Sequence, residues 1–168
     1  GPLFADKDVI VIGGGNAGFE SAAQLLAYAK SVTLLNRSDA FRCDKITVDK
    51  VLAHPNMRVI KNAVPIEVKG STFVEAMTYT DTTTGESHEL KAEGIFVEIG
   101  QIPNTGFVES LVKLDEFKKI VIDPMTQRTS VTGIWAAGDA TNGLYHQNNI
   151  AAGDAVKALE NLYLYLHA

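Results

Sequence analysis

The sequence predicts an α/β protein built on a parallel sheet. Four consecutive apolar residues, Val9–Ile12, indicate a strand that is buried on both faces. A glycine-rich turn, Gly13–Gly18, and a run with helical character, Ser21–Tyr28, follow this strand directly. A second apolar stretch, Ser31–Leu35, begins at the spacing of a β-α-β unit. Strand, turn, helix and strand in this order are typical of a domain whose parallel strands are linked by helices.

The turn carries the pattern Gly13-x-Gly15-x-x-Gly18, and its place between a strand and a helix raises it above a chance match. Gly13 allows the tight turn, Gly15 lets a pyrophosphate approach the main chain, and Gly18 lets the helix pack closely on the strand. The start of the helix offers unpaired N–H groups and a positive dipole end to the phosphates. We therefore predict a dinucleotide-binding turn in a Rossmann-like domain. The alternative is an ordinary glycine-rich turn.

Length and composition fit one ordinary domain or two small ones. The 168 residues are 46% hydrophobic and 21% charged, which is typical of soluble globular proteins. The net charge of −5 argues against a nucleic-acid or anionic membrane surface, and no apolar run approaches membrane-spanning length. No signal-peptide pattern appears at the start of the sequence, and no residue is assigned to a metal. The single cysteine, Cys43, excludes an internal disulfide, so we expect a cytoplasmic protein.

The tip of the second predicted strand bears on the choice of nucleotide. An acidic residue at this tip accepts from the 2′-hydroxyl of NAD, whereas arginine accommodates the 2′-phosphate of NADP. The tip carries Asn36, and Arg37 and Arg42 follow within six positions. Two guanidinium groups can bind a phosphate in bidentate fashion, which favours NADP. The alternative is that the two arginines form a solvated surface pair.

The rest of the first half predicts an insert in the parallel fold. A helical pattern over Cys43–His54 stops at Pro55, and Met57–Ile60 forms a short strand. Alternating polarity then indicates a small antiparallel meander with three strands: Val64–Val68, Phe73–Tyr79 and Ser87–Leu90. A buried strand over Gly94–Gly100 closes this first domain.

The second half changes character after a connector, Gln101–Thr105, in which Pro103 ends the strand pattern. Three short apolar runs predict strands, at Lys119–Asp123, Thr129–Val131 and Ile134–Ala137. The last segment, from about Asn148 to Leu166, predicts a helix with a broad apolar stripe. Such a stripe favours a core or subunit contact over a cofactor contact.

Five ordered motifs together are more specific than any one of them: GGGNAG, NRSDAFR, FVEIGQIPNT, GIWAAGD and YHQNNIAAG. On these motifs the chain resembles, over essentially its whole length, the low-molecular-weight thioredoxin reductases and the flavoprotein subunit of alkyl hydroperoxide reductase. The resemblance implies a Rossmann-like, three-layer NAD(P)-binding domain with an antiparallel meander over residues 1–105. It also implies the C-terminal half of a discontinuous FAD-binding domain over residues 106–168.

The resemblance implies a set of residues that contact the nicotinamide dinucleotide: Gly13, Gly15, Asn16, Ala17, Gly18, Glu20, Asn36, Arg37, Ser38, Arg42, Ile99 and Gly100. Arg37 and Arg42 match two of the three arginines that the family pattern HRRxxFR places at the 2′-phosphate. Ser38 stands at the third position, and Asn36 replaces the histidine. Relatives that use NADH carry an acidic residue near this tip, so the resemblance favours NADPH.

A second set is implied for FAD: Gly138, Asp139, His146, Gln147 and Asn148. Asp139 would bind the ribityl or phosphate region, and Gly138 would let the backbone approach it. Gln147 and Asn148 would touch the isoalloxazine ring from the start of a helix. His146 departs from the usual arginine, and its alternative is a structural or solvated histidine.

The implied activity passes a hydride from NADPH to FAD and two electrons to a disulfide. The first G-x-G-x-x-G for FAD and the redox C-x-x-C are not in this sequence, and Cys43 has no partner thiol. We therefore predict no catalytic residue in the chain and interpret Cys43 as a packing residue. Gly1–Phe4 resembles the stretch that follows the C-x-x-C, although Gly1-Pro2 is also typical of a tag remnant.

We accordingly expect a complementary N-terminal segment that carries the C-x-x-C, because the last helix would otherwise expose a large apolar patch. The expected partners are a disulfide protein of the thioredoxin or peroxiredoxin systems and a second subunit in a homodimer. One alternative function is an NAD(P)H reductase of a ferredoxin or peroxide system that lacks the C-x-x-C. Another is a non-catalytic module that senses NADPH.

Overall fold

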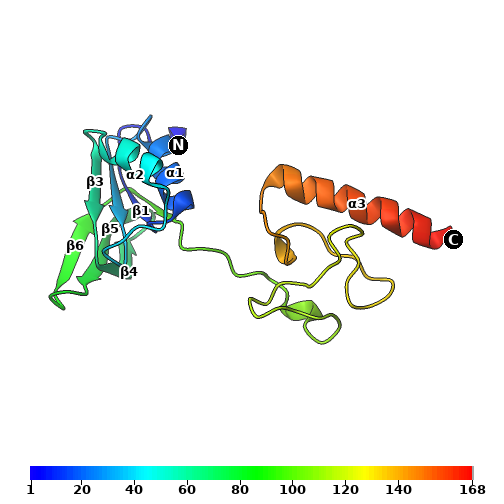
Figure 1. The fold of residues 1–168 in the computed structure, drawn as a ribbon. Helices are drawn as coiled ribbons and strands as arrows, with labels where there is room; N and C mark the ends of the chain where they lie inside the picture. Colours follow the sequence, from blue (N-terminus) through cyan, green and yellow to red (C-terminus); the bar gives the residue numbers. More distant parts are fainter. Residues whose placement is uncertain (168) are drawn as a thin grey trace. The chain divides into compact units, whose positions relative to one another are not determined.

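The computed structural model describes residues 1–167, which form two compact units (Figure 1). The first unit is Gly1–Gly100, and the second begins at Gln101. Each unit is described by itself.

A four-stranded parallel sheet forms the centre of the first unit. Its strands lie in the order β3-β2-β1-β7, with bounds β1 Asp8–Ile12, β2 Ser31–Leu35, β3 Met57–Ile60 and β7 Gly94–Val97. Ile12 pairs with Leu35 and Val97, and Leu35 pairs with Ile60. The carboxyl ends of all four strands therefore meet at one edge, where ligands of open α/β sheets bind.

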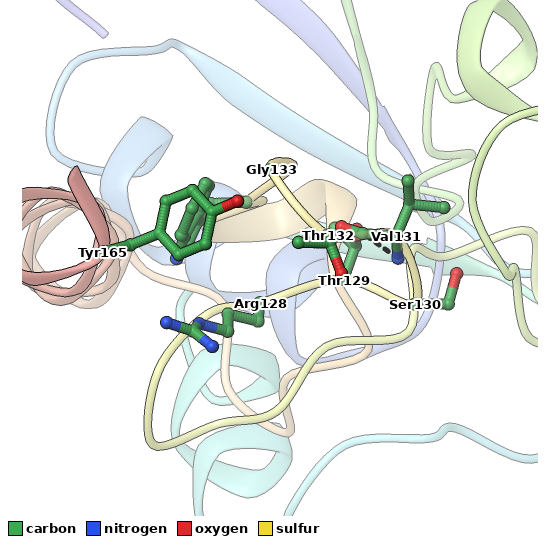
Figure 2. A pocket seen from close by; sticks show the side chains of 8 residues that line it. Arg128, Thr129, Ser130, Val131, Thr132, Gly133 and Tyr165 are labelled. Atoms are coloured by element: carbon green, nitrogen blue, oxygen red, sulfur yellow. Dashed lines mark hydrogen bonds between the residues drawn. The ribbon is translucent and has the colours of Figure 1, made fainter. Parts of the chain in front are cut away.

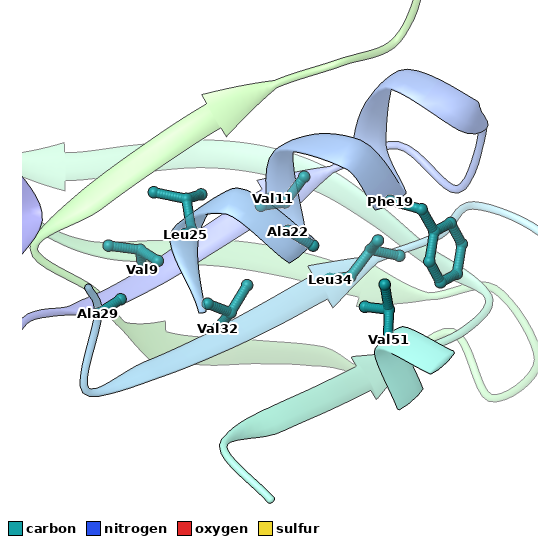
Figure 3. Packing of buried hydrophobic residues seen from close by; sticks show 9 residues of the cluster. All are labelled: Val9, Val11, Phe19, Ala22, Leu25, Ala29, Val32, Leu34 and Val51. Carbon is teal, nitrogen blue, oxygen red and sulfur yellow. The ribbon is translucent and has the colours of Figure 1, made fainter. Parts of the chain in front are cut away.

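Two helices, α1 (Asn16–Leu25) and α2 (Lys45–Leu52), cover one face of this sheet. Alternate side chains of β1 and β2 pack against them in a dry cluster (Figure 3), formed by Val9, Val11, Phe19, Ala22, Leu25, Ala29, Val32, Leu34 and Val51. Helix α1 begins at Asn16, five residues before the run that predicted it, because the glycine turn itself continues into the helix. Asp44 caps α2 by accepting a hydrogen bond from the Thr47 N–H at 2.8 Å.

The opposite face is covered by a three-stranded antiparallel sheet, β4 (Ala63–Gly70), β5 (Val74–Asp81) and β6 (Ser87–Lys91). The residues buried between the two sheets are Ile10, Ile12, Leu35, Ala63, Met77 and Ala92. Helices, parallel sheet and antiparallel sheet make three layers, so the predicted α/β fold with a meander is confirmed. A short 3-10 helix, η1 (Pro2–Phe4), precedes β1, and Phe4 packs edge-on against Phe96 of β7 with ring centroids 5.0 Å apart.

The second unit contains two short 3-10 helices, η2 (Gly106–Val108) and η3 (Gly138–Ala140), and the long helix α3 (Asn148–Leu166). Helix α3 was predicted within these bounds. The three strands predicted for this half are wrong: between Gln101 and His167 the backbone forms only isolated bridges. The bridges join Leu114 to Ile120, Ile120 to Thr141, Ile122 to Thr129 and Arg128 to Trp135.

The predicted strands fail because each apolar run pairs with a neighbour at only one or two residues before the chain turns away. Asp123, for example, ends the first run by accepting hydrogen bonds from the Met125 N–H at 2.9 Å and from the Thr126 hydroxyl. The core of the unit is correspondingly small, with Val112, Ile120 and Ile122 as its buried members.

Helix α3 has no fully buried residue, and its apolar stripe is open. Val156, Leu159, Tyr163 and Leu166 are each more than half exposed. None of the helices in residues 1–167 is long and apolar enough to cross a membrane.

The end of the predicted connector is packed into the second unit. Thr105 is 2% exposed, and its hydroxyl donates to the Lys118 carbonyl at 2.6 Å. Gly100, in contrast, has a φ of +113° and open space around its Cα.

Candidate functional site

Two of the three motif glycines are required by the chain's own backbone. Gly13 has a φ of +127°, and a Cβ at this position would collide with the Glu98 carbonyl oxygen. A Cβ on Gly18 would collide with the Gly13 carbonyl oxygen. Gly15 is different, because an added Cβ would meet only the Arg42 carbonyl oxygen at 3.8 Å. Gly15 thus keeps the surface at the start of α1 open, as the approach of a phosphate requires.

Asn36 shapes the loop at the carboxyl end of β2. Its side chain is 6% exposed, and its Nδ2 donates to the Ser38 carbonyl at 2.7 Å and to the Ala40 carbonyl at 3.0 Å. A buried polar group with satisfied hydrogen bonds is a rigid support. Asn36 therefore contributes to this site by holding the residues that follow it.

Arg37 and Arg42 lie on this loop with exposed side chains. The Arg42 N–H donates to the Gly14 carbonyl at 2.8 Å, which holds the loop against the glycine turn. Asn16 adds a further link, because its Oδ1 accepts from the Asp44 N–H at 3.3 Å. Within residues 1–167 neither arginine forms an ion pair with a carboxylate. Both guanidinium groups are available to an anion.

The end of β7 completes this edge. Ser21 on α1 donates to Glu98 Oε1 at 2.7 Å, which links the helix to the strand end. Ile99, which is 74% exposed, and Gly100 follow directly, and Glu20 is also exposed. Glu98 was not predicted as a site residue, although its place before Ile99 in the motif FVEIG marks a strand end.

Cys43 lies beside this edge and packs partly buried against the helix-side core. Burial raises the pKa of its thiol, and the neighbouring Asp44 carboxylate raises that pKa further. The group therefore stays a thiol, which agrees with its interpretation as a packing residue. Within residues 1–167 no cluster of three or more His, Cys, Asp or Glu side chains is placed to hold a metal.

A second group of predicted residues comes together in the second unit. Gly138 opens η3 with a φ of +72°, and a Cβ there would lie 3.2 Å from that of Ala151 on α3. The next residue, Asp139, has a half-exposed carboxylate, 3.6 Å from Nδ1 of His146. A hollow beside them is lined by Gln101–Asn104, Lys119, Asp139, Ala140 and His146.

His146 is held by a lysine that the sequence motifs do not single out. Lys119 Nζ lies 2.7 Å from His146 Nε2. An ammonium group has only donors, so Nε2 accepts and the ring proton belongs on Nδ1. Nδ1 is buried and lacks a hydrogen-bond partner among the described residues, because 3.6 Å to Asp139 is too long. Lys119 and Asp139 therefore lie on the two ring nitrogens of His146 beside the hollow.

Gln147 and Asn148 follow at the start of α3, and both are exposed. Gln147 is the N-cap residue, with its carbonyl accepting from the Ala151 N–H at 2.9 Å, and its side chain makes no capping hydrogen bond. The structure thus places Gly138, Asp139 and His146 together, with Gln147 and Asn148 next to them along the chain.

A smaller hollow lies between α3 and the segment Arg128–Gly133 (Figure 2). Arg128 lies over the rings of Trp135 and Tyr165, 5.7 and 5.5 Å from their centroids. Its Nε donates to Asn161 Oδ1 at 2.7 Å, and the indole N–H of Trp135 donates to the same oxygen at 3.1 Å. These contacts attach the C-terminal half of α3 to the unit.

Comparison with known families identifies the family of the chain. The family model described as "Pyridine nucleotide-disulphide oxidoreductase" matches residues 2–155. The chain belongs to this family. The expected resemblance is thereby confirmed, and the family is one of redox enzymes that work with pyridine nucleotides.

The chain is also similar to curated redox proteins. The chain is 39% identical to an NADH dehydrogenase of Bacillus subtilis and 40% identical to the F subunit of an alkyl hydroperoxide reductase of Staphylococcus aureus. Each alignment covers 99% of this chain and 32% of the relative. The chain therefore spans about a third of the length of the curated relatives that it matches.

Solved thioredoxin reductases share the fold. The enzyme of Lactococcus lactis superposes with a TM-score of 0.82 at 32% identity, over 98% of this chain and 54% of that one. The enzyme of T. acidophilum superposes with a TM-score of 0.80 at 39% identity, over 99% and 55%.

Proposed function

We propose that the first unit binds NADPH at the carboxyl edge of its parallel sheet. The observation that carries this proposal is the open surface at Gly15 beside the two unpaired guanidinium groups of Arg37 and Arg42. The residues assigned to the dinucleotide are Gly13, Gly15, Asn16, Ala17, Gly18, Glu20, Asn36, Arg37, Ser38, Arg42, Ile99 and Gly100. Among them, Asn36 acts through the loop that it holds.

The second unit would supply part of a flavin site. FAD fits the residues present, because the backbone turns at Gly138 with a φ of +72° and because the next residue, Asp139, lines a hollow together with His146. Gly138, Asp139, His146, Gln147 and Asn148 would hold the group. Bound FAD supplies the hydride acceptor and passes electrons on to a disulfide.

The chain's own part in this chemistry is binding and orientation. We assign residues 1–105 to NAD(P) binding and residues 106–168 to the C-terminal part of the FAD-binding domain. We propose Pro103–Gly106 as the hinge about which the two domains rotate to alternate between reducing the flavin and exposing the dithiol. Thr105 is anchored to the Lys118 carbonyl, so we expect the backbone rotation to begin before it. Gly100, which has a φ of +113°, lies shortly before this segment.

The proposed partners follow from the length of the relatives and from the open stripe on α3. A complementary N-terminal segment with the first FAD glycine motif and the C-x-x-C would cover that stripe, and a homodimer would complete the assembly. The electron acceptor would be a thioredoxin-like or peroxiredoxin-system disulfide protein in the cytoplasm. The alkyl hydroperoxide reductase of Staphylococcus aureus and the thioredoxin reductases are the relatives that suggest these partners.

Calorimetric titration of the 168-residue chain with NADP⁺ and with NAD⁺ tests the proposal, since the two differ only in the 2′-phosphate. We expect NADP⁺ to bind more tightly, and we expect this preference to shrink as salt concentration rises, because charged groups on the surface are screened. Absence of binding for both nucleotides would overturn the proposal. Tighter binding of NAD⁺ would overturn the choice of cofactor alone.

A second candidate function is an NADH-using reductase without a C-x-x-C, in a ferredoxin or peroxide system. The name of the Bacillus subtilis relative, NADH dehydrogenase, favours it. A third is a non-catalytic module that senses NADPH. Flavin absorbance that NADPH bleaches in the longer protein would support the disulfide reductase or the NAD(P)H reductase, whereas dinucleotide binding without flavin would support the module.

A further inference from the structure

Lys61 lies beside the loop that carries Arg37 and Arg42, and neither motif nor resemblance assigns it a role. It follows β3 directly, so it stands at the carboxyl edge of the sheet next to the end of β2. Its Nζ is 3.2 Å from Asp39 Oδ1 and 5.2 Å from the centre of the Phe41 ring. Lys61 is thus in contact with two residues of the loop.

The residues around Lys61 are held in place by packing and by a backbone hydrogen bond. Phe41 packs edge-on against Phe19 of α1, with ring centroids 5.0 Å apart, and Phe19 is fully buried. The Ala63 N–H donates to the Asn36 carbonyl at 3.0 Å, which ties the segment after β3 to the start of the loop. Lys61 therefore stands beside the same loop that carries Arg37 and Arg42.

Lys61 neutralises the negative charge that Asp39 places on this loop. An unpaired carboxylate on this loop would repel a 2′-phosphate and attract a ribose 2′-hydroxyl. The Lys61 ammonium neutralises it. The two side chains are 43% and 82% exposed, so their ion pair is screened by solvent and the ammonium stays accessible to a further anion.

We propose that Lys61 is the third cation of the 2′-phosphate site and takes the role of the family arginine whose position Ser38 occupies. The Lys61–Asp39 pair then sets the preference between NADP and NAD. On NADP binding the ammonium, which has three donors, bridges Asp39 and the phosphate. With the lysine removed, the free Asp39 carboxylate favours the 2′-hydroxyl of NAD. This inference rests on the proposed dinucleotide site.

The test is the ratio of NADP⁺ to NAD⁺ affinity in the 168-residue chain and its variants. Lys61→Met is expected to weaken NADP⁺ binding about tenfold, the loss of one charge-assisted hydrogen bond, and to leave NAD⁺ binding unchanged or slightly tighter. Lys61→Arg is expected to restore NADP⁺ binding. Asp39→Asn is expected to tighten NADP⁺ binding a few-fold, because a like charge is removed.

Lys69→Met is the matched control, since Lys69 is also 43% exposed and pairs with Glu89 at 2.8 Å on the antiparallel sheet. It should leave both affinities unchanged. A Lys61→Met variant that keeps the wild-type affinity ratio would overturn this inference and leave the proposed function standing. If the wild-type chain binds neither nucleotide, the proposed function fails and this inference fails with it.

Discussion

The first unit buries its central sheet on both faces, whereas the second unit leaves most of its apolar surface open. In the first, Val9, Val11, Val32 and Leu34 are at most 1% exposed between sheet and helices. In the second, the buried core consists of three side chains, and α3 contributes none. Both units come from runs of similar apolar character in the sequence. The difference in burial arises because the described residues supply packing partners for the apolar runs of the first unit but few for those of the second.

This comparison assigns different tasks to the two halves. The first unit supplies its own layers and holds the glycine turn rigidly, because the turn is braced by β7 and by the loop after β2. The second unit leaves the apolar stripe of α3 exposed. We therefore expect stability to be governed by residues of the first unit and assembly by residues of the second.

The largest expected effect separates the two kinds of glycine in the turn. Gly18→Ala places a methyl group against the Gly13 carbonyl oxygen and is expected to lower the free energy of unfolding by about 4 kcal/mol. Gly15→Ala meets no close neighbour and is expected to change stability by less than about 1 kcal/mol while weakening NADP⁺ binding. Urea unfolding and calorimetric titration measure the two effects. Equal stability of the two variants would contradict the packing role of Gly18.

Leucines of the two units are expected to respond differently to truncation. Leu34→Ala removes a fully buried side chain from the cluster under α1 and is expected to cost about 3 kcal/mol in the free energy of unfolding. Leu159→Ala truncates an α3 side chain that is 61% exposed, so a change within about 0.5 kcal/mol is expected. Denaturant titration followed by circular dichroism checks both. A larger loss from Leu159→Ala in the presence of the proposed N-terminal segment than in this chain alone would show that the segment covers the stripe.

The same comparison shows which parts of the fold could be predicted from the sequence. The parallel strands, the meander and α3 follow from local periodicity, because each is long enough to show its own pattern. The three strands predicted after Lys119 failed, since pairing depends on neighbours that are distant in sequence. Apolar runs alone do not distinguish a strand from a buried irregular segment.

The candidate sites also contain features that the sequence predicts and contacts that it does not. Glycine positions and the arginines of the loop are visible in the sequence because their spacing carries the geometry. The contacts of Lys61 with Asp39 and of Lys119 with His146 join residues that lie 22 and 27 positions apart. No local pattern marks such pairs, so only the fold reveals them.

A smaller effect is expected where α3 is attached. Asn161→Leu removes the oxygen that accepts from both Arg128 and Trp135. Arg128 is exposed and can turn to water, whereas the indole N–H of Trp135 is partly buried. We expect about 1 kcal/mol of lost stability, confined to the second unit, because the unsatisfied indole N–H carries a desolvation cost. Hydrogen exchange of the α3 amides, compared with the amides of β1, measures it. Glu160→Ala, next to it on an exposed part of the helix, is the control; equal protection in both variants would contradict the attachment.

The smallest expected effect concerns acid stability of the first unit. The hydroxyl of Ser31 donates to the Asp8 carboxylate at 2.6 Å, and this bond, with a weaker contribution from Lys30, lowers the pKa of Asp8 from its ordinary value. A lowered pKa in the folded state means that the unfolded chain binds the proton first as pH falls. The stabilisation is therefore complete above about pH 4 and is lost as pH falls through the folded pKa.

Ser31→Ala should raise the pKa of Asp8 in an NMR titration and move acid unfolding to higher pH. Because the Asp8 side chain is 40% exposed, solvent screening limits the expected loss to a few tenths of a kcal/mol at neutral pH. The Asp123 carboxylate of the second unit, whose pKa is lowered by the Met125 N–H and the Thr126 hydroxyl, should titrate unchanged in this variant. A shift at Asp123 would show that the acid responses of the two units are coupled.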